Sequence, residues 1–152
     1  MTTTVDYKIP YNYLPLQYSE NSSLASDILH DMGMEIRRGL FTIGPWVEKF
    51  EQAICDKYGV AHCIAVNSGT DALILAMKAT GIGRGDTVLV PANTFVATIG
   101  AIVAVGATPM FIDVGLDYQM DLDKAVHRRA LAAIPVHLTG LARNEQIFPL
   151  AI

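Results

Sequence analysis

From about residue 62 onward, the chain alternates between short apolar runs and longer segments whose apolar residues recur at helical spacing. Two consecutive strands that are separated by a helix lie parallel in a sheet, because the helix carries the chain back to the edge where the first strand began. The alternation therefore predicts an α/β fold with a mostly parallel sheet that helices cover on both faces. The strands are predicted at residues 62–66, 87–90, 109–112 and 132–136, and the helices at residues 71–79, 94–105 and 121–131.

Two further helices are predicted before this alternating part. The first ends at Gly39, and the second begins at Pro45 and ends before Gly59. Residues 1–22 show no clear period and are predicted to form an irregular N-terminal arm. Residues 23–152 then form one domain. Its four strands and its apolar end predict an incomplete sheet, so we expect a truncated domain from a shortened or frame-shifted gene.

Charge and cysteine content exclude several classes of protein. The formal net charge of −4 gives no electrostatic support to a nucleic-acid partner. The two cysteines, Cys55 and Cys63, are too few for a disulfide scaffold or a cysteine-based zinc site, and the histidines have no metal-ligand spacing. We therefore expect a reduced, cytoplasmic setting and no metal.

The longest uncharged stretch, residues 95–112, approaches the length of a membrane-spanning helix. Gly106 and Pro109 interrupt it, which indicates a buried helix followed by a buried strand rather than a membrane span. The first eight residues do not have the pattern of a signal peptide. No membrane association is predicted.

The turn Asn67-Ser-Gly-Thr-Asp71 joins a predicted strand to the helix that follows it. Such a turn directs backbone N–H groups and a helix dipole at one point, as a phosphate site requires. Gly69 permits close approach of a ligand, and Thr70 adds a hydroxyl group. Capping of the helix by Ser68 and Thr70 explains the same residues equally well, so both interpretations stay open. The glycine-rich patterns of Walker and dinucleotide-binding loops are absent.

Two more candidates follow predicted strands at the carboxyl edge of the sheet, where open α/β sheets bind ligands. Phe95 could lie on a planar ring there, although the pattern alone favours a core phenylalanine that opens a helix. His137 follows the last strand, and a hydrogen-bonded structural histidine is the favoured interpretation. Asp113 and Asp117 fit a polar loop, whereas Asp121 and Asp123 fit the start of a helix.

Taken together, six segments resemble the amino-terminal half of the DegT-type nucleotide-sugar aminotransferases, which are pyridoxal-phosphate enzymes of fold type I. The similarity runs from about Ile9 to Gly140. The segments are, in order, Gly44-Pro-Trp-Val-Glu48, Asn67-Ser-Gly-Thr-Asp-Ala-Leu73, Gly81-Ile-Gly-Arg-Gly-Asp86, Pro91-Ala-Asn-Thr-Phe-Val-Ala-Thr98, Gly106-Ala-Thr-Pro109 and Ile134-Pro-Val-His-Leu-Thr-Gly140.

The resemblance implies a cofactor, a reaction and an assembly. Pyridoxal 5'-phosphate would have its phosphate held by Ser68, Gly69 and Thr70, and Phe95 would stack on its pyridine ring. The reaction would move an amino group from glutamate or glutamine to a nucleotide-linked keto sugar, in amino sugar and polysaccharide biosynthesis. The family works as a homodimer with active sites at the subunit boundary.

The chain departs from the family in ways that bear on activity. The segment between Asp123 and Ala132 is several residues short, and the residues after Gly140 follow a different course. The Schiff-base lysine and the aspartate that binds the pyridinium nitrogen lie, in the family, beyond the end of this chain. No lysine follows Lys124. The resemblance thus assigns cofactor-binding residues but no catalytic residue.

Three alternatives remain open on the sequence. The first is a non-transaminating enzyme of the same fold, such as a dehydratase, in which some relatives replace the lysine by histidine. The second is a non-catalytic remnant that only dimerises. A nucleotide-binding Rossmann domain is the third, and it lacks the glycine fingerprint.

Overall fold

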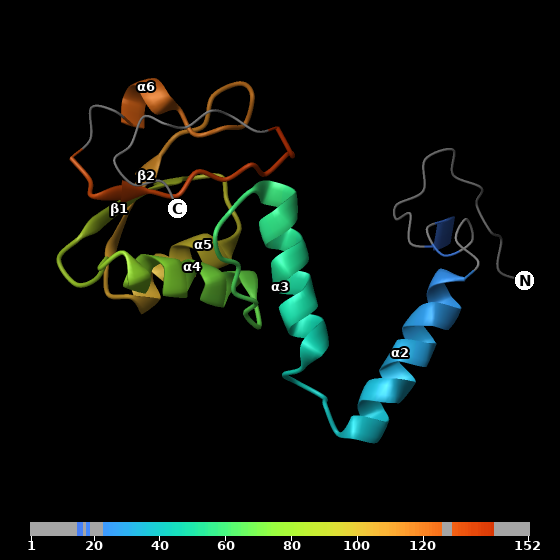
Figure 1. Cartoon of the computed structure of the whole chain (residues 1–152). Coiled ribbons are helices and arrows are strands. Elements are labelled where there is room, and N and C mark those ends of the chain that lie inside the picture. The colour runs from blue at the N-terminus through green and yellow to red at the C-terminus, as the bar shows by residue number, and fades with distance from the viewer. Residues whose placement is uncertain (1–14, 17, 19–22, 126–128, 142–152) are drawn as a thin grey trace, which may run out of the picture. The chain divides into compact units, whose positions relative to one another are not determined.

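A computed structural model of the chain describes residues 15–16, 18, 23–125 and 129–141 (Figure 1). Contacts between residues divide the chain into two units, residues 1–65 and residues 66–152. The division falls close to the turn that joins the N-terminal helices to the alternating part of the sequence.

The first unit contains two helices, α2 (Leu24–Arg38) and α3 (Pro45–Tyr58). Both end as their sequences predict, because Gly39 and Gly59 adopt left-handed backbone angles that a residue with a side chain rarely takes. Neither helix has a buried residue. Of the predicted irregular arm, the described residues 15, 16 and 18 have helical conformation, and the others lie outside the described residues.

The second unit is built on a three-stranded sheet with the order β2-β1-β3. The strands are β1 (Thr87–Pro91), β2 (Thr108–Ile112) and β3 (Ala132–Ala133). Both pairings are parallel, with Val88 opposite Pro109 on one side and Ala132 on the other. The helices are α4 (Gly69–Ala79), α5 (Val96–Ala104) and α6 (Leu122–Ala125). The predicted α/β class and parallel sheet are confirmed.

Side chains of β1 alternate between two layers of helices. Val88 and Val90 belong to a buried cluster that includes Met77 of α4 and Ile102 of α5. Leu89 belongs to a second buried cluster, which contains residues of β2, β3 and α6. Accordingly, α4 and α5 lie on one side of the sheet and α6 on the other (Figure 1). The period of two in β1 therefore sets up the three-layered arrangement.

The predicted strand at residues 62–66 is wrong. These residues form no strand, and the side chain of Ile64 is 79% exposed. A strand exists only through the hydrogen bonds that it makes with a neighbour, and no described strand pairs with this segment. Two other elements are shorter than predicted. Strand β3 covers two residues of the predicted 132–136. Helix α6 covers Leu122–Ala125 of the predicted 121–131, and residues 126–128 lie outside the described part.

The uncharged stretch at 95–112 contains a helix and a strand, as predicted. Helix α5 is followed by a turn at Gly106, where φ is +84°, and β2 begins at Thr108. A Cβ atom at Gly106 would lie 3.6 Å from the backbone nitrogen of Arg84, so the turn also lies close to a neighbouring loop. Within the described residues, no helix is long and apolar enough to cross a membrane.

Candidate functional site

Helix α4 begins directly after Ser68, whose backbone is extended. The Ser68 hydroxyl accepts a hydrogen bond from the backbone N–H of Asp71 at 3.1 Å and lies 3.2 Å from the Asp71 carboxylate. The Ser68 carbonyl accepts from the N–H of Ala72 at 3.0 Å. Ser68 therefore caps the helix, which confirms the structural interpretation for this residue.

The next two N–H groups of α4, those of Gly69 and Thr70, have no acceptor among the described residues. They belong to the first turn, whose N–H groups have no partner within the helix and lie at the positive end of its dipole. Thr70 is partly exposed and occupies the second helical position, so it is neither in mid-helix nor buried. These two N–H groups are available to an anion.

Gly69 has no structural requirement within the described residues. Its φ angle is not left-handed, and a Cβ atom built on it would meet nothing within 4 Å. Any small residue would fit this position as far as the chain itself is concerned. The space beside Gly69 is therefore open to a group from outside the chain.

Phe95 lies just before α5 with an extended backbone, and its side chain is 68% exposed. The interpretation as a core phenylalanine, favoured by pattern alone, is therefore wrong. The helix that Phe95 precedes buries Thr98, Ala101 and Ile102 instead. An exposed aromatic ring at this position is free to contact a planar ligand.

The start of α4 and Phe95 lie at the same edge of the sheet. Helix α4 leads through a short loop into the amino end of β1, so its own beginning lies towards the carboxyl end of that strand. Phe95 follows β1 at that carboxyl end. Helices α4 and α5 also pack against each other (Figure 1). The edge is the one where open parallel sheets bind ligands.

The other polar candidates lie in loops or on helix α6. His137 is exposed and its carbonyl accepts from the N–H of Gly140 at 3.0 Å in a turn. The Asp117 carboxylate accepts from the N–H of Gln119 at 3.1 Å, as a polar loop requires. Among the described residues, no group of acidic, histidine and cysteine side chains is arranged to hold a metal ion.

Lys124 is held by two carboxylates. Its ammonium group lies 3.3 Å from Asp113 and 3.2 Å from Asp121. The Lys124 backbone N–H also approaches the Asp121 carboxylate at 3.3 Å, so Asp121 caps α6 as its sequence position predicts. These contacts with Lys124, the side-chain hydrogen bond first, hold the pKa of Asp121 below its ordinary value of 3.8.

This pKa shift predicts an acid-sensitive start of α6. Because the pKa of Asp121 is lower in the folded chain, its carboxylate stabilises the fold above about pH 3.8 and loses that effect as the pH falls through the folded pKa. We expect Lys124→Met to raise the pKa of Asp121 towards its ordinary value, as measured by carbon-detected NMR titration. Asp123→Asn serves as the control and should leave the Asp121 titration unchanged, since Asp123 makes no side-chain contact with Asp121 among the hydrogen bonds described.

One contact of the first unit has no sequence signal. The N–H of Ala65 donates to the Glu51 carboxylate at 2.7 Å, across fourteen residues. In the sequence, Glu51 is an ordinary polar residue near the start of a predicted helix. Only the path of residues 60–65 in three dimensions brings the two groups together.

Comparison with known proteins shows which family and which fold this chain shares. The fold matches the S. venezuelae DesV structure, solved with a ketimine intermediate, at a TM-score of 0.80 and 33% identity over 93% of this chain and 38% of that one. Such neighbours are sugar aminotransferases of the fold-type I pyridoxal-phosphate class, and the chain has the fold of part of their large domain. A model of the DegT/DnrJ/EryC1/StrS aminotransferase family matches residues 23–146. The chain belongs to this family.

Two curated relatives are nucleotide-sugar aminotransferases. The chain is 40% identical to the dTDP-3-amino-3,4,6-trideoxy-alpha-D-glucose transaminase of Micromonospora megalomicea subsp. nigra, over 92% of this chain and 36% of the relative. It is 43% identical to the UDP-N-acetyl-3-dehydro-alpha-D-glucosamine 3-aminotransferase of Acidithiobacillus ferrooxidans, over 78% of this chain and 33% of the relative. The chain thus spans about a third of the length of these relatives.

Proposed function

We propose that this chain forms the cofactor-phosphate side of a pyridoxal-phosphate enzyme that moves an amino group from glutamate or glutamine to a nucleotide-linked keto sugar. Membership of the aminotransferase family and the names of the two curated relatives support the reaction class. The observation that carries the proposal is the start of α4, where Gly69 and Thr70 offer two N–H groups without an acceptor among the described residues.

The described residues fit the cofactor. A phosphate is an anion, and the N–H groups of Gly69 and Thr70 lie at the positive end of a helix dipole. The open space beside Gly69 admits the phosphate oxygens without a clash. Phe95 offers an exposed aromatic face at the same edge of the sheet, which suits a pyridine ring. Ser68 contributes by fixing the start of the helix through Asp71.

Bound pyridoxal phosphate supplies the electron sink and the carbonyl group that transamination needs. The residues of this chain bind and orient it: Gly69 and Thr70 hold the phosphate, and Phe95 limits the tilt of the ring and shields one face from water. A lysine and a carboxylate must complete the site. None of the described lysines has a position that serves this purpose, so we assign no catalytic residue to the chain.

The assembly and the boundaries are part of the same proposal. We place residues 23–152 in the cofactor-binding domain, after an arm at residues 1–22, in a cytoplasmic homodimer. Helices α2 and α3 support a partner because neither buries a residue within the chain. Amino sugar and polysaccharide biosynthesis is the proposed setting, since the curated relatives are named for reactions that form amino sugars.

The reaction is tested on the product of the gene that encodes this sequence, including whatever follows Ile152. The purified protein receives pyridoxal phosphate, glutamate and either a dTDP-linked or a UDP-linked keto sugar. We expect 2-oxoglutarate and an amino-sugar nucleotide, detected by mass spectrometry, in equal amounts. Loss of water from the sugar without transfer of nitrogen would instead support the dehydratase alternative.

Gly69→Ala should weaken cofactor binding without destabilising the fold. The added methyl group meets no atom of the chain but enters the space proposed for the phosphate. We expect the dissociation constant for pyridoxal phosphate, measured by fluorescence titration of the 152-residue chain, to rise by about tenfold, which corresponds to about 1.4 kcal/mol.

Gly33→Ala provides the matched control, because a Cβ atom at that position of α2 also meets nothing within 4 Å. Both alanine variants should unfold at or above the urea concentration of the parent chain, since alanine favours a helix. Equal cofactor affinities of the two variants would remove Gly69 from the phosphate site.

Phe95→Leu tests the second part of the site. Leucine keeps the apolar bulk but lacks the aromatic face, so we expect a several-fold loss of pyridoxal phosphate affinity and a changed absorption maximum of the bound cofactor. The same chain should lose no affinity for inorganic phosphate, because the N–H groups of Gly69 and Thr70 are unaffected. A parallel loss for both ligands would mean that Phe95 acts by shaping the start of α5.

A further inference from the structure

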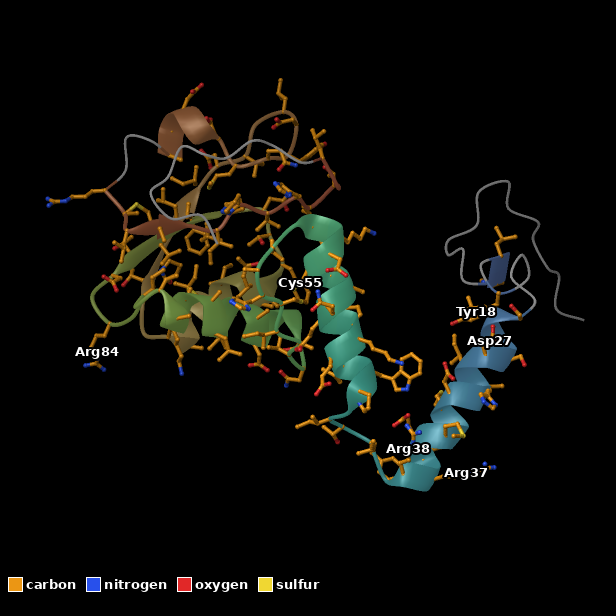
Figure 2. The ribbon with its side chains drawn as sticks, viewed as in Figure 1. Tyr18, Asp27, Arg37, Arg38, Cys55 and Arg84 are labelled. Atoms are coloured by element: carbon orange, nitrogen blue, oxygen red, sulfur yellow. The ribbon has the colours of Figure 1, made fainter. Side chains whose placement is uncertain are left out.

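We propose that Cys55 and Cys63 form a reversible intrachain disulfide, which fastens residues 60–65 to α3 when the chain meets an oxidised small-molecule disulfide. The two thiols are free and partly buried, and both line the same hollow on the surface of the first unit. Cys55 is labelled on α3 in Figure 2. The proposal is independent of the proposed cofactor site.

The path of the chain after α3 brings the two cysteines to one face of the helix. Helix α3 ends at Tyr58, and the N–H of Val60 donates back to the Cys55 carbonyl at 3.2 Å. Residues 60–65 then return along the helix, because the N–H of Ala65 donates to the Glu51 carboxylate at 2.7 Å. Glu51 lies one turn before Cys55 on the same helix face. Cys63 therefore lies in a segment that is anchored at both ends beside Cys55.

Electrostatic coupling supports this proximity. The pKa of the Cys55 thiol is raised above its ordinary value, first by burial and then by the nearby Cys63, Asp56 and Glu51. Glu48 and His62 line the same hollow. The thiolate is the reactive form, so the reaction is slow at neutral pH and accelerates as the pH rises. The raised pKa limits the fraction of Cys55 thiolate, whereas the position of both cysteines in one hollow favours closure of the link once one thiol has reacted.

The reaction balances as two thiol–disulfide exchanges. One protein thiolate attacks a sulfur atom of oxidised glutathione, which breaks its S–S bond and releases one glutathione thiolate. The second protein thiolate then attacks the protein sulfur of the mixed disulfide and releases the second glutathione. Two protein thiols are oxidised and one small disulfide is reduced. The two protons that leave the protein thiols are taken up by the two glutathione thiolates, so two glutathione thiols result. An excess of reduced glutathione reverses both steps.

The test treats the 152-residue chain with oxidised glutathione at pH 8.5 and digests it with trypsin after blocking free thiols. Cleavage after Lys49, Lys57 and Lys78 leaves Cys55 and Cys63 in separate peptides, 50–57 and 58–78. We expect these peptides to appear joined, and reduction to separate them. A mixture of 14N and 15N chains should give joined peptides of one isotope only. Mixed-isotope pairs, or glutathione adducts on each cysteine without a link, would overturn the proposal.

Glu51 offers a matched pair of variants that isolates the geometry. Glu51→Gln and Glu51→Ala both remove the same negative charge, so the two variants change the electrostatic surroundings of Cys55 alike, but only glutamine keeps an acceptor for the N–H of Ala65. We expect the link to form several-fold faster in the glutamine variant than in the alanine variant, and to form slowest in urea-unfolded chain. Equal rates in all three samples would show that the fold does not bring the thiols together. Circular dichroism of each variant verifies that α3 is retained.

Discussion

Leu89→Ala should lower the free energy of unfolding of the chain by about 2–5 kcal/mol, the range for deletion of a fully buried leucine side chain. Leu89 is 0% exposed, lies in the middle of the central strand β1, and belongs to the buried cluster that contains Ile112, Met120 and Ala133. Two of the neighbours in this cluster, Ala125 of α6 and Ala133 of β3, are small, so few groups can move in to fill the space. Urea denaturation followed by circular dichroism measures the change in midpoint.

Val103→Ala is the control for this substitution. Val103 lies on α5 with a side chain that is 58% exposed, so its truncation should change the free energy of unfolding by less than about 0.5 kcal/mol. An effect as large as that of Leu89→Ala would mean that the outer face of α5 is covered in solution. A small effect of Leu89→Ala itself would contradict the central position of β1.

The second large effect concerns activity: the 152-residue chain alone should give no detectable transamination with glutamate and a nucleotide-linked keto sugar. Transamination by this class of enzyme needs a lysine that reaches the cofactor. Lys78 is eight residues beyond Thr70 on α4, about 12 Å at 1.5 Å per residue. Lys124 is paired with Asp113 and Asp121.

The remaining described lysines are also engaged elsewhere. The Lys49 ammonium lies 4.2 Å from the centre of the Trp46 ring, and that of Lys57 lies 5.9 Å from the centre of the Tyr58 ring. A coupled assay for 2-oxoglutarate measures turnover, with the same chain plus a full-length family member as a positive control. Turnover by the chain alone that disappears in a Lys78→Met or Lys124→Met variant would contradict the expectation and identify the lysine.

Features that depend on neighbouring residues in the sequence were predicted well. The left-handed glycines at the ends of α2 and α3 and the proline at the start of α3 set helix bounds by local sterics alone. The alternation of strands and helices determined the parallel sheet, since a crossover helix leaves little choice of direction. The segment at 62–66 failed for the opposite reason: its apolar residues satisfy the pattern, but a strand needs a partner that sequence periodicity does not supply.

The candidate site shows the same division. A turn of small residues before an apolar run at helical spacing was enough to locate the start of α4, although the strand predicted before that turn is absent. The resemblance gave Gly69, Thr70 and Phe95 their proposed roles. The separate roles of Ser68, Gly69 and Thr70 could not be predicted from the sequence. In the structure, the Ser68 hydroxyl accepts a hydrogen bond from the N–H of Asp71, so Ser68 acts as the cap. The exposure of Phe95 also could not be read from the sequence, since the pattern of an aromatic residue before an apolar helix favours a core position.

The order of strands in the sheet has a consequence for how the sheet is assembled. Thr87 pairs with Thr108, 21 residues away (108 − 87), whereas Val88 pairs with Ala132, 44 residues away (132 − 88). A doubling of the closed loop costs about 0.6 kcal/mol of chain entropy, so joining β1 to β2 through α5 is the less costly closure. The βαβ unit β1–α5–β2 can therefore form locally. Strand β3 then pairs with the free edge of β1.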